Sequence, residues 1–427
     1  MPNNIPSPSK TLIVIGGGAA GFFCAVNAAR NNSDLTVKIL EKGNKLLSKV
    51  KVSGGGRCNV THDCFDVPEL VTKYPRGNHF LKKSLHHFNT KDTIDWFEER
   101  SIHLKTEKDG RMFPTTNSSQ TIVDCLLREA NRYNIEILMN ADVKKIEQEG
   151  AHFCIHTAND KEYKADYVCV ACGGFPKLQQ FDWLVQLGHC VNAPVPSLFT
   201  FNMPDNSINQ LMGISVDIAT IKIIGSKLSS KGPVLITHWG LSGPAVLKLS
   251  AYAARELAEK QYQFSILINW LSNYTEQLLR EDWQRLQRLL SSQNLHQKNP
   301  FNLPSRLWNY LLQHAEITFD MRWSNLPAKN RNKLIQTLTA QVFQVNGKTT
   351  YKDEFVTCGG ISLAEIDANT MQSRKVPNLF FAGEIMDVDG ITGGFNFQHA
   401  WTSGWLAAKA VGEMSKQEQL VNSTSSL

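Results

Sequence analysis

A glycine-rich turn between apolar segments near the start of the chain constrains the fold more than any other feature of the sequence. Residues 11–15 (TLIVI) have the composition of a buried strand, and the turn at residues 16–21 (GGGAAG) follows them directly. Residues 19–30 are rich in alanine, as a helix would be, and residues 35–40 form a second strand-like run. The order strand, turn, helix, strand predicts a β–α–β unit, and therefore an α/β fold with a parallel sheet.

The glycines of this turn have the spacing G-x-G-x-x-G. Gly16 permits the tight turn, Gly18 lets backbone N–H groups approach a pyrophosphate, and Gly21 permits close packing of helix on strand. The amino end of the helix also favours an anion. Glu41 ends the second strand-like run, 25 residues after Gly16, where a carboxylate accepts hydrogen bonds from an adenosine ribose. The pattern predicts a Rossmann-type site, and the single fingerprint indicates one permanently bound dinucleotide.

A second glycine segment, SGGGRCN at residues 53–59, predicts a loop. Three consecutive glycines disfavour the interior of a helix or strand, because each costs about 1 kcal/mol relative to alanine. We expect the backbone at Gly55 to approach a bound group closely, with Arg57 and Asn59 supplying hydrogen-bond donors. A flavin presents acceptors on its pyrimidine edge and gains negative charge on reduction, so it suits this loop. The segment therefore favours FAD as the dinucleotide.

A third glycine-rich stretch lies near the end of the chain. Residues 378–382 (NLFFA) resemble a last parallel strand, Gly383 and Glu384 follow, and GGFNFQ from Gly393 opens a helix expected at residues 395–414. Glu384 is placed to accept hydrogen bonds from the ribityl hydroxyls. The positive end of the helix would stabilise a reduced, anionic flavin. The sequence thus predicts an FAD site built from both ends of the chain.

The middle of the chain has a different texture. From about residue 192, prolines and short strand-like pieces appear, and a polar helical stretch follows at residues 275–341. The chain also exceeds the roughly 250–300 residues that one core usually supports. We therefore predict an FAD-binding domain at residues 1–191 and 346–427, interrupted by an inserted substrate module at residues 192–345.

Composition excludes several classes of function. The net charge is +6, but Lys and Arg are scattered instead of forming blocks, so nucleic acid is not favoured as a partner. The nine cysteines lack zinc-site spacing, so we predict no metal site and free thiols in a reducing cytoplasm. The first apolar run, residues 11–15, is too short for a signal sequence or a membrane span, and the polar ends, residues 1–10 and 415–427, are expected to be frayed or disordered. We expect a cytoplasmic protein that acts on a small molecule, in an oligomeric state that the sequence does not define.

Taken together, the motifs resemble the BaiN-like (YhiN-type) flavoprotein family, also known as aminoacetone-oxidase-type FAD-binding enzymes. The resemblance runs from near residue 12 to about residue 410. It implies an FAD domain interrupted by an insert with a small β-barrel and a helical part. The matching segments are VIGGGAAG (14–21), LEKG (40–43), SGGGRCNVTH (53–62), GRMFP (110–114), THWGLSGPAVLKLS (237–250), VTCGGISLAEID (356–367) and FAGEIMDVDGITGGFNFQHAWTSG (381–404).

The resemblance also implies which residues contact FAD. The backbone of Val143 would contact the adenine. Further candidates for contact with FAD are Ala19, Gly55, Gly173 and Phe395, because they lie in or beside glycine turns. The residues carried over by motif are Gly16, Gly18, Ala20 and Gly21 for the pyrophosphate, Glu41 and Lys42 for the adenosine ribose, Arg57 and Asn59 for the flavin, and Gly383, Glu384, Gly394 and Asn396 for the ribityl chain and flavin.

These features predict an FAD-dependent oxidoreductase that passes hydride between flavin N5 and a small organic substrate. Two reactions stay open: NAD(P)H-driven reduction of an activated C=C bond, with NAD(P)H as a transient co-substrate, and O₂-coupled oxidation of an amine such as aminoacetone. A non-catalytic flavin-bearing protein that associates with RNA or senses redox state is the alternative from another class. His238, between an apolar strand and Gly240, is a candidate proton donor or acceptor.

Overall fold

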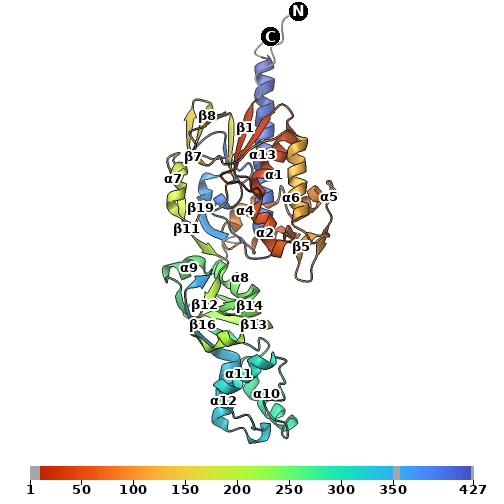
Figure 1. The fold of residues 1–427 in the computed structure, drawn as a ribbon, viewed down its shortest axis with the longest axis vertical. Coiled ribbons are helices and arrows are strands. Elements are labelled where there is room, and N and C mark those ends of the chain that lie inside the picture. Colours follow the sequence, from red (N-terminus) through yellow and green to blue (C-terminus); the bar gives the residue numbers. More distant parts are fainter. Residues whose placement is uncertain (1–9, 350–355, 425–427) are drawn as a thin grey trace, which may run out of the picture. The chain divides into compact units, whose positions relative to one another are not determined.

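The chain forms two compact units. The computed structural model describes residues 10–349 and 356–424 (Figure 1). The first unit consists of Met1–Pro196 with Lys352–Leu427, and the second of Ser197–Tyr351. The predicted boundaries of the functional domains, at residues 191/192 and 345/346, stay predictions.

Pairing between distant segments holds the first unit together. Strand β11 (Val191–Ser197) pairs with β19 (Val356–Ile361) in a two-stranded sheet. This pairing joins the residues that precede the second unit to those that follow it.

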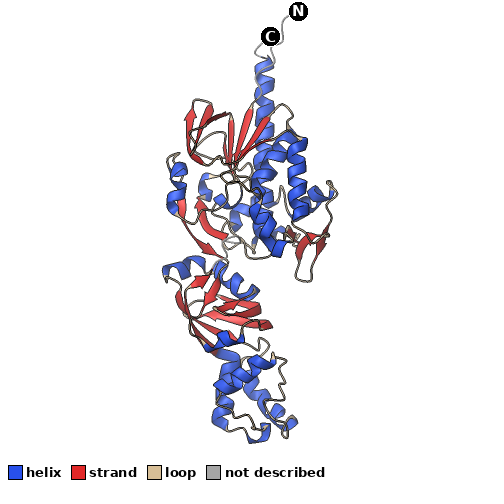
Figure 2. Cartoon of the chain, in the orientation of Figure 1, coloured by secondary structure: helices blue, strands red, loops and turns tan. Residues whose placement is uncertain are grey.

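A five-stranded parallel sheet lies at the centre of the first unit, in the order β20-β10-β1-β2-β6 (Figure 2). Leu12 of β1 pairs with Val37 on one side and with Tyr167 on the other. Leu12, Ile13 and Val14 are fully buried, as expected for a parallel sheet covered on both faces. The predicted α/β fold is confirmed. The strands are β1 (Thr11–Ile15), β2 (Thr36–Leu40), β6 (Glu136–Leu138), β10 (Tyr167–Val170) and β20 (Leu379–Phe381).

Two helices from opposite ends of the chain pack against each other in this unit. Helix α1 (Ala19–Asn31) is buried along most of its length, as a helix that is apolar on all sides must be. It packs along α13 (Phe395–Thr424). The two backbones approach closely, since a Cβ on Gly404 would lie 2.7 Å from the carbonyl oxygen of Ala20.

Helix α13 corrects one expectation from the sequence. It continues past residue 414 to Thr424, where disorder was expected. Ser415 is fully buried, and its hydroxyl accepts a hydrogen bond from Nδ2 of Asn32 at 2.8 Å. Because this contact joins residues far apart in the chain, the polar composition of the segment gave no sign of it.

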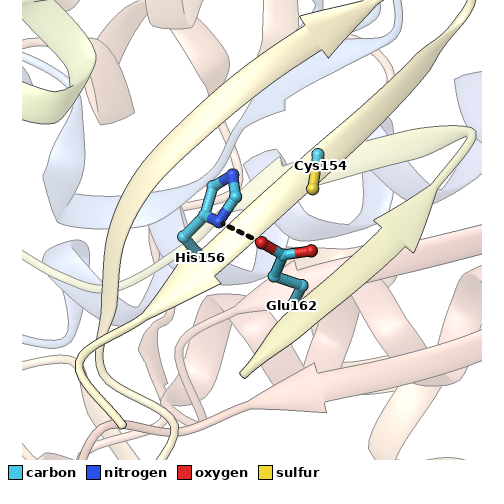
Figure 3. A group of neighbouring side chains, drawn as sticks. All are labelled: Cys154, His156 and Glu162. Atoms are coloured by element: carbon cyan, nitrogen blue, oxygen red, sulfur yellow. Dashed lines mark ion pairs between the residues drawn. The ribbon is translucent and has the colours of Figure 1, made fainter. Parts of the chain in front are cut away.

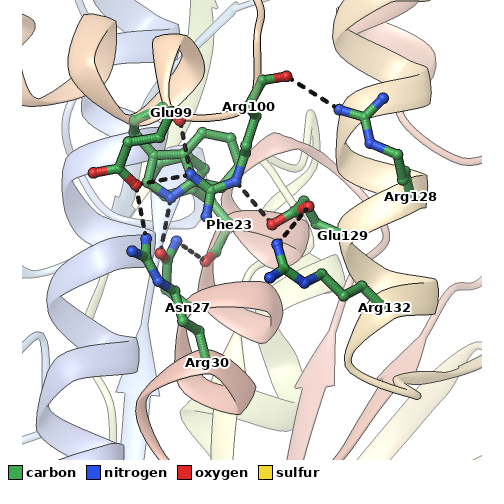
Figure 4. A network of polar contacts seen from close by, with 9 residues as sticks. Phe23, Asn27, Arg30, Glu99, Arg100, Arg128, Glu129 and Arg132 are labelled. Atoms are coloured by element: carbon green, nitrogen blue, oxygen red, sulfur yellow. Dashed lines mark hydrogen bonds and ion pairs between the residues drawn. The ribbon is translucent and has the colours of Figure 1, made fainter.

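A buried polar network joins α1, α5 (Thr90–Glu98) and α6 (Gln120–Arg132) (Figure 4). Arg100 and Glu129 form an ion pair at 2.9 Å, with both side chains almost fully buried. The Arg100 guanidinium lies 3.6 Å from the centre of the Trp96 ring. Trp96 Nε1–H in turn donates to Oδ1 of Asn27 at 2.9 Å. The network therefore provides partners for polar groups inside an otherwise apolar contact between helices.

Smaller elements complete the first unit. Two three-stranded antiparallel sheets have the orders β3-β5-β4 and β7-β8-β9. Their strands are β3 (Thr61–His62), β4 (Leu104–Thr106), β5 (Arg111–Pro114), β7 (Val143–Glu149), β8 (His152–Thr157) and β9 (Glu162–Ala165). The short helices are α2 (Ser48–Gly56), α3 (Val67–Val71), α4 (Asn78–Leu85) and α7 (Asp182–Val185).

The second unit begins with a seven-stranded antiparallel sheet in the order β17-β16-β13-β14-β15-β12-β18. Its two outer strands, β17 and β18, are separated in the chain by Gly347 alone. This connection brings the two edges of the sheet together, as in a barrel. The strands are β12 (Thr200–Asn202), β13 (Ser215–Ile223), β14 (Ser229–Thr237), β15 (Gly240–Ser242), β16 (Gln263–Asn269), β17 (Gln341–Asn346) and β18 (Lys348–Thr349).

The helical part of the second unit shares one apolar core with the sheet. Four tryptophans, Trp270, Trp283, Trp308 and Trp323, are fully buried there. The helices are α8 (Pro244–Tyr252), α9 (Ala254–Glu259), α10 (Glu276–Leu289), α11 (Ser305–His314) and α12 (Ala328–Ala340). Within the described residues, no helix has the length and apolar character that crossing a membrane requires.

Candidate functional site

The turn between β1 and α1 has the geometry of a phosphate site. Gly16 adopts a φ of +117°, and a Cβ on Gly21 would collide with the Gly16 carbonyl. By contrast, nothing lies within 4 Å of the position that a Cβ on Gly18 would take. Gly18 is the N-cap of α1, with no side chain capping it. The amides of the first helical turn therefore face open space, which fits the pyrophosphate of FAD.

Glu41 connects the end of β2 to this turn. Its Oε2 accepts a hydrogen bond from the Gly17 amide and its Oε1 accepts one from the Gly43 amide, both at 2.8 Å. Each carboxylate oxygen keeps a further lone pair, so the side chain can still accept from ribose hydroxyls. Lys42 beside it is exposed, with its ammonium 5.6 Å from the centre of the Phe175 ring. Val143 begins β7 and is buried.

The triple glycine ends α2 and departs from helical geometry, so that it forms an open turn. Gly54, Gly55 and Gly56 all have positive φ, between +58° and +82°. A Cβ on Gly55 or Gly56 would meet nothing within 4 Å. The backbone at Gly55 and Gly56 is therefore open to an approaching group, and its contact with a flavin stays a prediction.

Arg57 and Asn59 have protein partners in this structure. The Arg57 guanidinium lies 4.0 Å from the centre of the Phe113 ring, and its Nη1 is 2.5 Å from Oε1 of Glu107. With its amide oriented to satisfy both groups, Asn59 donates to Thr61 O at 3.0 Å and accepts from Gly394 N at 2.9 Å. Asn59 thus ties the second glycine segment to the third, and the contacts of both residues with a flavin stay a prediction.

Residues from the end of the chain meet the first helix. A Cβ on Gly383 would lie 2.8 Å from the Cβ of Ala20, beside Ala19 at the start of α1. Glu384 accepts a hydrogen bond from the Thr357 amide at 2.8 Å and pairs with the Lys49 ammonium at 2.6 Å. Gly173 has a φ of +78° and lies beside the same carboxylate.

The start of α13 packs against the segment that follows the triple glycine. Gly394 has a φ of +95°, and a Cβ there would press on the carbonyl of Thr61. Asn396 exchanges two hydrogen bonds with the backbone of Gly390, at 2.8 and 3.0 Å. The ring of Phe395 stacks on His62 with a centroid distance of 4.8 Å. The structure therefore brings the three predicted glycine segments together within the first unit.

Some residues of this region were not predicted from the sequence. His62 belongs to the quoted SGGGRCNVTH segment, and burial lowers its pKa, although Asp63 opposes the shift. Asp389 is fully buried and forms an ion pair with Arg76. Its position in an apparent surface turn gave no sign of this, because Arg76 is 313 residues away.

The predicted catalytic residue lies in the other unit. His238 is exposed in the turn between β14 and β15, and its ring contacts that of Trp239, with centroids 4.1 Å apart. Its role as a proton donor or acceptor stays a prediction.

The Cys58 thiol in the second glycine segment is inert, and the potential metal ligands lie outside the three glycine segments. Burial raises the pKa of the Cys58 thiol to about 12, so it is protonated near neutral pH and a poor nucleophile. In the part of the chain that the structure describes, Cys154, His156 and Glu162 form one group that could hold a metal ion (Figure 3). His156 is already paired with Glu162 at 3.2 Å and with Glu147 at 2.9 Å. These two contacts account for the positions of His156 and Glu162.

Comparison with protein families gives a match over most of the chain. The model described as "HI0933-like protein Rossmann domain" matches residues 10–410. The ribosomal RNA dihydrouridine synthase of Escherichia coli (strain K12) is 32% identical, over 93% of this chain and 96% of that protein. The protein of the same name from Haemophilus influenzae is 30% identical, over 93% and 98%. The 3-dehydro-bile acid delta(4,6)-reductase of Clostridium scindens is 25% identical, over 94% and 98%.

Solved structures share the fold at low sequence identity. The 3-ketosteroid delta1-dehydrogenase of Sterolibacterium denitrificans aligns with a TM-score of 0.51 and 12% identity, over 95% of this chain and 100% of that chain. The FrdA subunit of Escherichia coli quinol fumarate reductase aligns with a TM-score of 0.50 and 15% identity, over 96% and 71%. At such identities, the likeness concerns the fold alone.

Proposed function

The chain belongs to the HI0933-like Rossmann family, and from this we propose that it reduces a C=C bond conjugated to a carbonyl group, with NAD(P)H as the electron source. The resemblance inferred from the motifs is confirmed, and the chain is an FAD-dependent oxidoreductase. The proposal is based on the activities for which three relatives are named, each of which aligns with the chain over nearly its whole length. Dihydrouridine is uridine with two hydrogens added across the C5=C6 bond, next to the C4 carbonyl, and a delta(4,6)-reductase of a 3-dehydro compound acts on double bonds conjugated to a ketone.

Within this class, uridine in ribosomal RNA is the substrate that we propose. The two relatives of that name are 32% and 30% identical to the chain, against 25% for the bile acid reductase. An RNA substrate would reverse the expectation, drawn from scattered charges alone, that nucleic acid is not a partner.

The residues of the first unit would hold and orient the cofactor. FAD, when bound, supplies hydride transfer to and from its ring. The open amides at the start of α1 would bind its pyrophosphate and Glu41 its ribose. The amino end of α13, beside Gly394, would favour negative charge on the reduced ring. Reduction of a conjugated C=C bond also needs a proton at the α-carbon, and His238 is the candidate for its donor.

Anaerobic mixing of the purified yellow protein with NADH or NADPH tests this function. We expect either nicotinamide to bleach the flavin, and a uridine-containing fragment of ribosomal RNA to restore the colour as dihydrouridine forms. A His238→Gln variant should bleach normally and regain colour slowly. Turnover of amines with O₂ but not of C=C bonds would identify an oxidase instead, and a flavin that responds to neither would indicate a non-catalytic protein.

A further inference from the structure

The positive charge of the chain is concentrated in its second unit. Residues Ser197–Tyr351 contain 16 Lys and Arg against 9 Asp and Glu, a net charge of +7. The whole chain has a net charge of +6, so the first unit has a net charge of −1. The unit that holds the predicted phosphate site for FAD is therefore not the one that would attract a polyanion. The inserted unit has the electrostatic character of a nucleic-acid-binding element.

A groove of about 290 Å³ lies on the second unit, lined by residues of α11, α12, β17 and the short segment at Asn206 and Ser207. None of its lining residues is an Asp or a Glu. Lys333 supplies a cation, and amide and hydroxyl groups supply most of the other polar atoms. Among the polar lining residues are Asn206, Ser207, Tyr310, His314, Lys333 and Gln336.

Two rings and several amides give this groove the chemistry that unpaired bases need. Tyr310 and His314 lie on consecutive turns of α11, with ring centroids 4.5 Å apart. Tyr310 is held through its hydroxyl, 3.1 Å from Oγ of Ser207. Rings at the wall of a groove stack on bases, and Asn and Gln side chains offer both donors and acceptors to base edges.

An exposed cation lies beyond the groove on α12. Lys329, two residues into α12, is exposed and precedes Lys333 by one helical turn. The Lys333 ammonium pairs with the exposed Glu316 at 2.7 Å. Such a surface pair is weak, so a phosphate can compete for the lysine.

We propose that this groove binds a single-stranded segment of ribosomal RNA and docks the RNA substrate on the inserted unit. The proposal rests on the proposed function, since a reductase of small molecules would have no use for such a surface. RNA is favoured over an acidic peptide because the groove combines ring faces and amides with its cation, whereas carboxylates would need cations alone.

Binding of a fluorescent single-stranded RNA fragment to the holoenzyme tests the proposal. Lys333→Glu and Gln336→Glu place a carboxylate in the groove, and we expect each to weaken RNA binding about tenfold or more. Lys231→Glu is the matched control, because it makes the same charge change as Lys333→Glu at an exposed position of β14 that does not line the groove. It should weaken binding less than about threefold. Circular dichroism and flavin content would verify that each variant is folded.

The result can be separated from the fate of the proposed function. Reduction of the flavin by NAD(P)H should be unchanged in all three variants. If the wild-type enzyme reduces uridine in RNA and the groove variants bind RNA equally well, the docking site is wrong and the function stands. Equal losses in Lys231→Glu and Lys333→Glu, or no RNA binding by the wild type, would also overturn the docking site. If the groove variants lose RNA binding but no C=C bond is ever reduced, the docking site stands and the function is wrong.

Discussion

Gly18 and Gly21 stand three residues apart in one motif, yet the structure gives them different roles. A side chain on Gly21 would collide with the Gly16 carbonyl, whereas one on Gly18 would enter open space at the amino end of α1. Gly18 has a φ of −96° and a ψ of −170°, which any residue can adopt. The space beside Gly18 is therefore available to a ligand rather than required by the fold.

This difference predicts the effect of Gly18→Val. The apoprotein should lose little stability, because no protein atom lies within 4 Å of the position of the added Cβ. FAD affinity should fall about tenfold to hundredfold, because the side chain would keep the pyrophosphate from charge-assisted bonds to the amides. Titration of the apoprotein with FAD measures the affinity. Gly21→Val should instead lower the unfolding temperature of the apoprotein, and equal behaviour of the two variants would contradict this assignment.

The pH dependence of stability should reflect His399. Burial of the ring lowers its pKa to about 4, and Nε2 lies 3.1 Å from the Gly383 carbonyl, where the neutral ring donates. In the unfolded chain the pKa is about 6.5, so below that pH the unfolded state binds a proton that the folded state does not. Stability should therefore fall as the pH drops from about 6.5 towards about 4.

A His399→Gln variant tests this dependence. Glutamine keeps an N–H donor but does not titrate, so its free energy of unfolding should change less between about pH 7 and pH 5 than that of the wild type. Denaturant unfolding at several pH values measures both slopes. Identical slopes would show that the ring makes no such contribution.

At the scale of helices and strands, breaking the buried ion pair in the network of α1, α5 and α6 should strongly destabilise the fold. Removing one partner leaves a buried charge without compensation, so Glu129→Ala should lower the free energy of unfolding by about 3–5 kcal/mol. Arg30→Ala removes a neighbouring pair with Glu99 that is largely exposed, and it should cost less than about 1 kcal/mol. Chemical denaturation of both variants makes the comparison, and similar losses would show that burial of the pair is not decisive.

Elements whose signals are local could be predicted from the sequence. The turn from β1 to α1 and the strand before Gly383 depend on neighbouring residues, so their patterns sufficed. Contacts between distant residues could not be predicted in this way. The tie from Asn59 to Gly394 spans most of the chain, and Arg57 contacts Glu107, which is 50 residues away. The extension of α13 to Thr424 likewise depends on tertiary contacts.

For the whole molecule, the unequal charge of the two units predicts that salt will separate two activities. A single-stranded RNA that contacts three or four phosphate-binding groups loses about 20-fold to 50-fold in affinity between roughly 50 and 200 mM salt, because counterions compete. Reduction of a small neutral enone releases no such counterions. We therefore expect the KM for an RNA fragment to rise steeply with salt, while the KM for the enone changes less than about twofold. Steady-state rates of the same enzyme with each substrate, at saturating NAD(P)H and several salt concentrations, give the salt dependence of both KM values. Parallel responses would mean that the charge of the inserted unit, +7, does not act on the RNA substrate.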